Sequence, residues 1–232
     1  MAAAMKVSKL QKNIVCQTGK HTASVIFLHG SGDTGEGVYS WIKDLMGNGL
    51  VFPHIRMVFP TAPPRPYTPM MDQRTTVWFD RHRISPDVPD HMESVDTMCE
   101  HLNRLIEEEV NTGIPKERIV LGGFSMGGAM AMQVAYRHHP SIAGVAALSA
   151  FLNNDSVVYK AVKEAGGSLP ELFLCHGGKD PLVIPEWVKQ THRMMDSLGV
   201  PCQFHFFPKM YHEMCVQELE LLRTWILKKL PL

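Results

Sequence analysis

Gly122-Gly123-Phe124-Ser125-Met126-Gly127-Gly128 stands between two segments of opposite character. Residues 118–121 before it are mostly apolar and β-branched, which predicts a strand, and residues 129–136 after it are good helix formers. The order is therefore strand, abrupt turn and helix, with Ser125 at the bend. In this context residues 123–127 match G-x-S-x-G, the turn that exposes a nucleophilic serine at the end of a strand.

The glycines of this turn have a physical reason. A serine held clear of the sheet needs a strained backbone, and glycine at positions 123 and 127 removes the side chains that would collide there. The helix that follows also directs its positive end at the place where an oxyanion would form. An ordinary glycine-rich turn gives the same pattern, however, so the motif alone leaves both interpretations open.

Length and composition restrict the class of protein. A chain of 232 residues fits one α/β domain, residues 1–232, and can bury a large core. Its 23 Lys and Arg balance 23 Asp and Glu, whereas a nucleic-acid-binding protein normally carries a basic excess. No window is apolar and long enough for an integral membrane segment, and no apolar segment follows the basic residues near the start, as a secretory signal requires. We therefore expect neither a nucleic-acid partner nor a membrane span.

The cysteines indicate a reducing compartment. They are odd in number, scattered and without C-x-x-C spacing: Cys16, Cys99, Cys175, Cys202 and Cys215. Such thiols are typical of a cytosolic protein, so we expect a cytosolic (cytoplasmic) localisation. The oligomeric state stays open, with a monomer favoured.

Strands and helices alternate along the chain. Short apolar runs predict strands at residues 14–15 (an edge strand), 24–28, 55–59, 118–121, 143–148, 172–175 and 203–207. Helical spacing or helix-forming composition predicts helices at residues 39–46, 92–110, 129–136, 185–198 and 213–230. Apolar strands alternating with helices predict an α/β fold with a mainly parallel central sheet and helices on both faces.

Residues 60–89 lack a periodic pattern. Seven prolines fall in this span, at positions 60, 63, 64, 66, 69, 86 and 89. A structureless stretch of this length in a compact domain is usually a lid or binding loop, and a surface loop pinned by its prolines is the alternative. We name Trp78 and Phe79 of this loop, with Leu182 further on, as candidate substrate-binding residues.

A carboxylate and a histidine follow Ser125 in the order that a catalytic triad on such a turn requires. Asp180 comes after the predicted strand 172–175, and His212 lies between the last predicted strand and the last helix. Asp155, in a polar loop, and Asp196, within a helix, are weaker candidates. Singly, Asp180 is a common turn residue and His212 a common helix-start residue. Their coincidence with Ser125 favours a catalytic set.

A serine nucleophile also needs two backbone N–H groups to stabilise the oxyanion. One is expected from Met126, directly after the nucleophile, and the other from the loop after strand 24–28, where we choose Ser31. Such donors can each be worth about 10²–10³ in rate. Because they act through the backbone, substitution of either side chain should matter less than loss of Ser125.

The loop after strand 24–28 also fits a different class of protein. Residues 30–35 read Gly-Ser-Gly-Asp-Thr-Gly after a strand, which is the G-x-G-x-x-G of dinucleotide-binding folds. That interpretation needs an acidic residue about 20 positions on. Residues 55–61 contain none, and Gly37 would interrupt a helix starting at the third glycine. No metal or nucleotide motif is present either, so we expect no cofactor and no metal.

With these residues in place, the sequence resembles the acyl-protein thioesterase / lysophospholipase / carboxylesterase family of α/β-hydrolases, and within it the lysophospholipase-like branch. The likeness extends from about residue 25 to residue 230 and rests on ordered matches at residues 28–35, 61–66, 78–80, 122–128, 176–177, 180–183 and 211–212. It implies a cytosolic, cofactor-free hydrolase of carboxylic esters and thioesters. Ser125 would match the family's nucleophile, His212 its base and Asp180 the carboxylate that orients the base. Ser31 and Met126 would match its oxyanion-hole positions.

Two departures from the family pattern concern the acyl chain. The long-chain thioesterases of the family usually carry a bulky apolar residue in place of Ser31 and glutamine in place of Met126. Residues 67–74 also differ, where those enzymes line an acyl channel. The lysophospholipase-like branch is expected to favour short acyl groups. We therefore expect a short-chain preference, with protein depalmitoylation left open.

Two other functions are weighed against this one. A hydrolase fold can serve as a catalytically silent binding module. A prolyl-peptidase-like activity fits less well, because we find no second domain to gate peptides.

Overall fold

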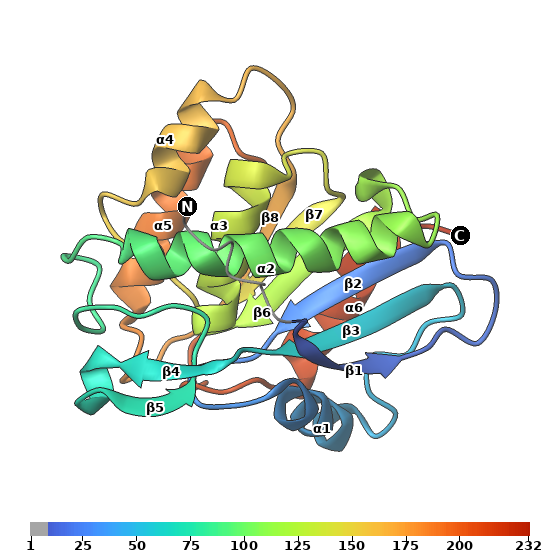
Figure 1. Ribbon diagram of the computed structural model, residues 1–232, viewed down its shortest axis with the longest axis horizontal. Helices are drawn as coiled ribbons and strands as arrows, with labels where there is room; N and C mark the ends of the chain where they lie inside the picture. The colour runs from blue at the N-terminus through green and yellow to red at the C-terminus, as the bar shows by residue number, and fades with distance from the viewer. Residues whose placement is uncertain (1–8) are drawn as a thin grey trace, which may run out of the picture.

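Seven strands form the central sheet of the described chain, residues 9–232. They are β1 (Gln11–Val15), β2 (Ala23–Leu28), β3 (Ile55–Thr61), β6 (Ile119–Phe124), β7 (Gly144–Leu148), β8 (Glu171–Gly177) and β9 (Cys202–Phe207). Their order across the sheet is β1-β3-β2-β6-β7-β8-β9, and only the edge strand β1 runs antiparallel to its neighbour. The mainly parallel sheet predicted from the sequence is confirmed, as the computed structural model in Figure 1 shows.

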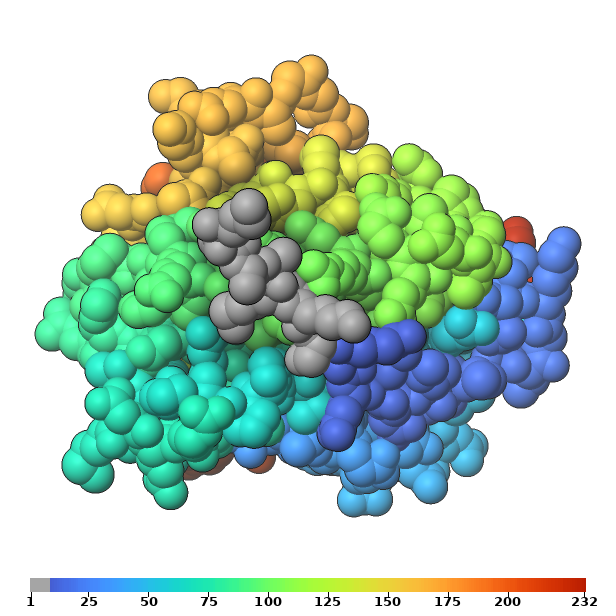
Figure 2. Space-filling model, viewed as in Figure 1, coloured from blue at the N-terminus to red at the C-terminus, as the bar shows by residue number. Residues whose placement is uncertain are grey.

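Helices cover both faces of this sheet. They are α1 (Gly35–Met46), α2 (Met92–Asn111), α3 (Met126–His138), α4 (Val157–Glu164), α5 (Pro185–Ser197) and α6 (Val216–Lys229). The buried residues of α2 to α5 belong to one apolar cluster and those of α1 and α6 to another, on the opposite face. In the space-filling view, which shows the face covered by α2 to α5, helix α2 crosses the middle (Figure 2). No helix within residues 9–232 combines the length and apolar character that crossing a bilayer requires.

The central strand β2 shows why the sheet is buried on both sides. Val25 and Phe27 point into the cluster of α1 and α6, while Ile26 and Leu28 point into that of α2 to α5. All four side chains are almost fully buried, and each contributes roughly 1.5–3 kcal/mol by leaving water. A continuous apolar run is therefore the correct signal for a strand between two helical layers.

Residues 1–8 lie outside the described residues. They include the start of the predicted domain and part of the region in which we expected no secretory signal. That residues 1–232 form one domain stays a prediction.

The expectation of a structureless stretch at residues 60–89 is wrong. Strands β4 (Pro64–Tyr67) and β5 (Gln73–Thr76) form an antiparallel hairpin, closed by the short 3-10 helix Thr68–Met70. The two prolines of β4 argue against a strand in the sequence, because proline has no N–H to donate to the hydrogen bonds between strands. Proline is tolerated in a strand only on an edge without a neighbouring strand. The hairpin is bound to the loop after β2, since the N–H of Gly32 donates to the carbonyl of Thr76 at 2.9 Å.

Two helices differ from the sequence prediction. Helix α1 begins at Gly35, although Gly37 was expected to interrupt a helix there; the Thr34 side chain caps the helix by accepting from the N–H of Gly37 at 2.9 Å. Helix α4 was not predicted, because its 8 residues are too few to display a helical pattern clearly. A second 3-10 turn, Lys116–Arg118, precedes β6.

The turn at Ser125 has the strained backbone that the sequence predicts. Ser125 has φ 54° and ψ −121°, a conformation that costs a non-glycine residue about 1–3 kcal/mol. A Cβ on Gly127 would lie 2.3 Å from the carbonyl oxygen of Leu28, and one on Gly123 would lie 2.5 Å from the carbonyl carbon of Gly127. Glycine at these two positions lets β2, β6 and α3 pack closely enough to hold the bend.

We expect Gly127→Ala to lower the free energy of unfolding by at least about 3 kcal/mol, because backbone atoms must move to admit the methyl group. Gly166→Ala is the matched control, since a Cβ there meets nothing within 4 Å. Denaturant unfolding measures both. Equal stability of the two variants would show that close packing at the bend is not required.

Candidate active site

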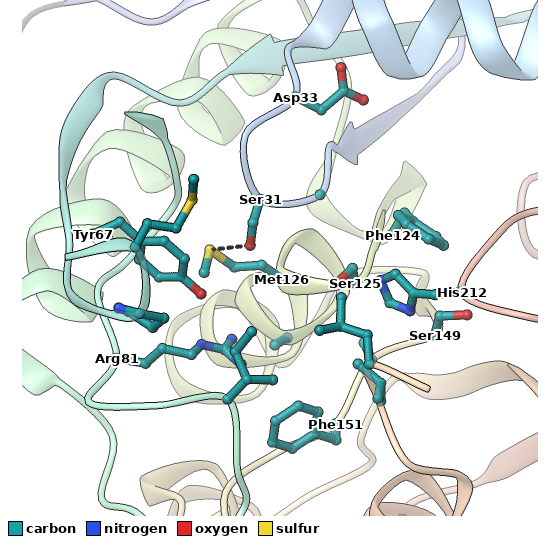
Figure 3. A pocket seen from close by; sticks show the side chains of 18 of the residues that line it. Ser31, Asp33, Tyr67, Arg81, Phe124, Ser125, Met126, Ser149, Phe151 and His212 are labelled. Atoms are coloured by element: carbon teal, nitrogen blue, oxygen red, sulfur yellow. Dashed lines mark hydrogen bonds between the residues drawn. The ribbon is translucent and has the colours of Figure 1, made fainter. Parts of the chain in front are cut away.

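Ser125, His212 and Asp180 meet at the carboxyl ends of three strands. Ser125 follows β6, Asp180 follows β8, and His212 lies in the loop between β9 and α6. The Ser125 Oγ is 3.0 Å from His212 Nε2, and His212 Nδ1 is 2.6 Å from Asp180 Oδ2. Figure 3 shows the imidazole beside the serine. The structure therefore brings together the three residues that the sequence singled out.

Asp180 is held as a buried, charged carboxylate. Burial raises the pKa of Asp180, but the hydrogen bonds from His212 and from the N–H of Val183 outweigh it, so the pKa lies below its ordinary value. Its Oδ1 accepts from the N–H groups of Leu182 at 2.9 Å and Val183 at 2.8 Å. Its Oδ2 is thereby aimed at His212. The alternative carboxylate Asp155 is exposed and makes no hydrogen bond with His212 in the described chain.

A second histidine, His176, lies beside this carboxylate. Its Nε2 is 3.0 Å from the carbonyl of Val183 and 4.0 Å from Asp180 Oδ2. Burial lowers the pKa of His176 to about 4, so the ring is neutral near neutral pH. A neutral ring does not compete with His212 for the negative charge of Asp180. In the sequence, His176 stands out only as part of a family match, and no pattern there indicates this role.

The loop after β2 is fixed beside the first turn of α3. Met126 is the first residue of α3, so its N–H has no acceptor within the helix. The Ser31 hydroxyl donates to the Met126 sulfur at 3.6 Å, which brings the two predicted oxyanion-hole residues together (Figure 3). The buried His29 ring supports this loop, since its Nδ1–H donates to the carbonyl of Gly30 at 2.7 Å and its Nε2 accepts from Ala62 at 3.0 Å.

A cavity of about 320 Å³ opens at these residues. Of the three candidate substrate-binding residues, Leu182 lines the cavity, whereas Trp78 and Phe79 do not. Trp78 is fully buried and donates from Nε1 to the carbonyl of His29 at 2.8 Å, so it supports the loop after β2 from behind. Phe79 is also buried. The proposed contact of Trp78 and Phe79 with substrate is therefore corrected to a supporting role.

Three further residues of the wall were not found from the sequence: Tyr67 from the hairpin, Arg81, and Phe151. Phe151 could have been found by the rule that located Asp180, because it follows the strand β7 at the same edge of the sheet. Tyr67 and Arg81 lie in the non-periodic span 60–89, where no pattern indicates which side chains turn inward. Within residues 9–232, no three His, Cys, Asp or Glu side chains gather as they would around a metal ion.

Comparison with known proteins assigns the family. The sequence profile of the phospholipase/carboxylesterase family matches residues 10–230. The chain belongs to this family. It is 53% identical to lysophospholipase-like protein 1 of Mus musculus, over 100% of this chain and 97% of that protein. It is also 32% identical to acyl-protein thioesterase 1 of Gibberella zeae, over 91% of this chain and 92% of that protein.

Solved structures of the family agree. Zea mays acyl-protein thioesterase 2 matches with a TM-score of 0.82 and 26% identity, over 95% of this chain and 99% of that chain. The predicted α/β-hydrolase fold and the prediction of a hydrolase are confirmed. The catalytic roles of the individual residues stay predictions.

The neutral state of His176 predicts how stability depends on pH. The unfolded chain protonates this ring near pH 6.5, whereas the folded protein excludes the proton until about pH 4. The unfolded state therefore binds more protons in this window, and the free energy of unfolding falls as the pH falls, by at most about 3 kcal/mol.

We expect His176→Gln to weaken this loss of stability between about pH 7 and about pH 4.5, as measured by denaturant unfolding. The buried His139, whose pKa is also lowered to about 4, keeps its share in the variant. His82→Gln, at an exposed position, should retain the full dependence. An unchanged dependence in His176→Gln would contradict the neutral state.

Proposed function

We propose that this protein is a serine hydrolase that cleaves carboxylic esters and thioesters through an acyl-enzyme. The observation that supports the proposal is the continuous hydrogen-bond chain from the Ser125 hydroxyl through His212 to Asp180. Membership of a family whose members include acyl-protein thioesterases and carboxylesterases points to the same reaction.

In the proposed mechanism, Ser125 Oγ attacks the acyl carbon while His212 Nε2 takes its proton. Asp180 stabilises the imidazolium that results. The N–H groups of Ser31 and Met126 donate to the oxyanion, which lies at the positive end of α3. His212 then gives its proton to the departing alcohol or thiol, and a water molecule releases the acyl group by the same steps.

We further propose a preference for short acyl chains. The wall of the cavity includes the buried guanidinium of Arg81, and a long apolar chain placed against an unpaired cation would deprive it of any polar partner. The acyl-protein thioesterases among the relatives suggest protein-linked thioesters as one substrate class. We therefore include protein depalmitoylation in the proposal, as the reaction with the longest acyl chain and the lowest expected rate.

The proposed site of action is the cytosol. All five cysteines are free thiols in the structure, which suits a reducing compartment. We propose that the chain acts as one domain and as a monomer.

Ser125→Ala should abolish turnover of p-nitrophenyl butyrate and labelling by a fluorophosphonate, because the variant lacks the attacking oxygen. Both readouts use the purified full chain, with Ser197→Ala on the exposed end of α5 as the control. Wild-type turnover by Ser125→Ala would remove the nucleophile assignment. A wild-type protein that neither turns over nor becomes labelled would favour a silent binding module.

The kcat/KM for p-nitrophenyl esters should fall from short acyl groups to palmitoyl by at least about tenfold, which corresponds to about 1.4 kcal/mol. The reason is the polar end of the cavity at Arg81. A series from acetyl to palmitoyl at one detergent concentration measures it, with Ser125→Ala as the blank. A value that rises with chain length would contradict the short-chain preference.

A further inference from the structure

Arg81 is a buried cation in the wall of the cavity, and no carboxylate pairs with it. Arg81 is only 9% exposed to solvent. Its guanidinium carbon lies 4.9 Å from the ring centre of Phe79 and 5.4 Å from that of Phe151. Within residues 9–232 the guanidinium makes no ion pair within 4.0 Å, and its buried Nε has no hydrogen-bond partner. A desolvated charge is costly unless something pairs with it.

The nearby carboxylates are engaged elsewhere. Asp80 accepts from the N–H of Thr68 at 2.9 Å and from its hydroxyl at 2.7 Å. Asp90 accepts from Gln133 at 3.1 Å and from Ser156 at 2.8 Å. Burial lowers the pKa of Arg81, and the nearby Asp90 and Asp80 carboxylates oppose this shift, as does the Tyr67 phenol; an arginine in a protein nevertheless remains protonated. The two aromatic rings offset only part of the desolvation cost, because a cation–π contact is worth about 0.5–2 kcal/mol.

The guanidinium lies on the acyl side of the cavity. His212 must protonate the leaving group, so the leaving group lies toward the imidazole and the acyl group extends the other way. Figure 3 shows Ser125 with His212 on one side and Arg81 on the other, with Met126 and the Tyr67 hydroxyl toward Arg81. All of these residues line the same cavity. An acyl group bound to Ser125 therefore points its far end toward Arg81.

We propose that Arg81, with the Tyr67 hydroxyl as a second donor, binds a carboxylate at the far end of the acyl group. The substrates would then be esters or thioesters formed by one carboxyl group of a short dicarboxylic acid. Hydrolysis consumes one water molecule and releases the dicarboxylic acid and the alcohol or thiol. This inference rests on the proposed hydrolase function and names its substrate class.

Charge and shape favour a carboxylate over other anions. One guanidinium balances one negative charge, and its planar fork matches the two oxygens of a carboxylate. The volume of about 320 Å³ suits a short acyl group.

Two p-nitrophenyl esters of equal size test the proposal: the adipic acid monoester, which ends in a carboxylate, and its terminal carboxamide. The wild type should prefer the carboxylate by at least about tenfold in kcat/KM, as a charge-assisted hydrogen bond predicts. In Arg81→Met, which keeps apolar contact with the two rings, the ratio should fall to about one or below. Arg83→Met removes an exposed arginine two positions on and should keep the wild-type ratio.

The ratio separates binding of the carboxylate from a structural role, since damage to the fold lowers both rates together. Equal rates for the two esters in the wild type, or an unchanged ratio in Arg81→Met, would overturn the proposal. Arg81→Lys should retain part of the preference, because it keeps the charge but not the planar fork.

A binding measurement keeps the inference testable if neither ester is cleaved and the proposed function fails. Calorimetric titration of wild type with adipate and with adipamide requires no turnover. Binding of adipate alone, lost in Arg81→Met, would support the carboxylate site, and equal binding of both compounds would overturn it.

Discussion

The strained backbone at Ser125 is the constraint on which the rest of this structure depends. Its positive φ is maintained because Gly127 lies against the carbonyl of Leu28 and because the N–H of Ser125 donates to the carbonyl of Leu148 at 2.8 Å. Three neighbouring strands, β2, β6 and β7, thus hold one residue. The cost of the strain, about 1–3 kcal/mol, is small beside the apolar burial of these strands. A rigid sheet can therefore store strain at the single residue whose oxygen the proposed chemistry needs to be exposed.

The charges around Ser125 are arranged by unequal burial. Asp180 stays negative because three hydrogen bonds outweigh its desolvation, and His176 stays neutral because burial prevails. The negative charge of Asp180 is consequently not shared between His212 and a second charged histidine. Arg81 has no such internal partner, and the difference is instructive. Asp180 has its partner built into the fold, whereas the absence of one at Arg81 is the basis of the carboxylate site proposed above.

The sequence predicts those parts of the site that depend on strand ends. Ser125, Asp180 and His212 could be located because each follows a strand whose apolar run is readable, and the carboxyl ends of parallel strands share one edge. Helix α4 could not be located, because its two turns are too short for a period to emerge. The hairpin β4–β5 was concealed by Pro64 and Pro66. Trp78 and Phe79 show a different limit, because composition can indicate an important aromatic pair but not which way each ring points.

The segment that sequence patterns describe least well, residues 60–89, also supplies Tyr67 and Arg81 to the wall of the cavity. Its polar contacts include those of Asp80 with Thr68 and of Arg65 with the carbonyl of Trp78 at 3.3 Å. Ser125, the proposed nucleophile, is held instead by the strands of the packed sheet. We therefore expect substitutions of Tyr67 or Arg81 to change the proposed acyl selectivity without moving Ser125 or His212. The proposed chemistry and the proposed selectivity thus lie in different elements, and likeness to thioesterases constrains the reaction more tightly than the acyl group.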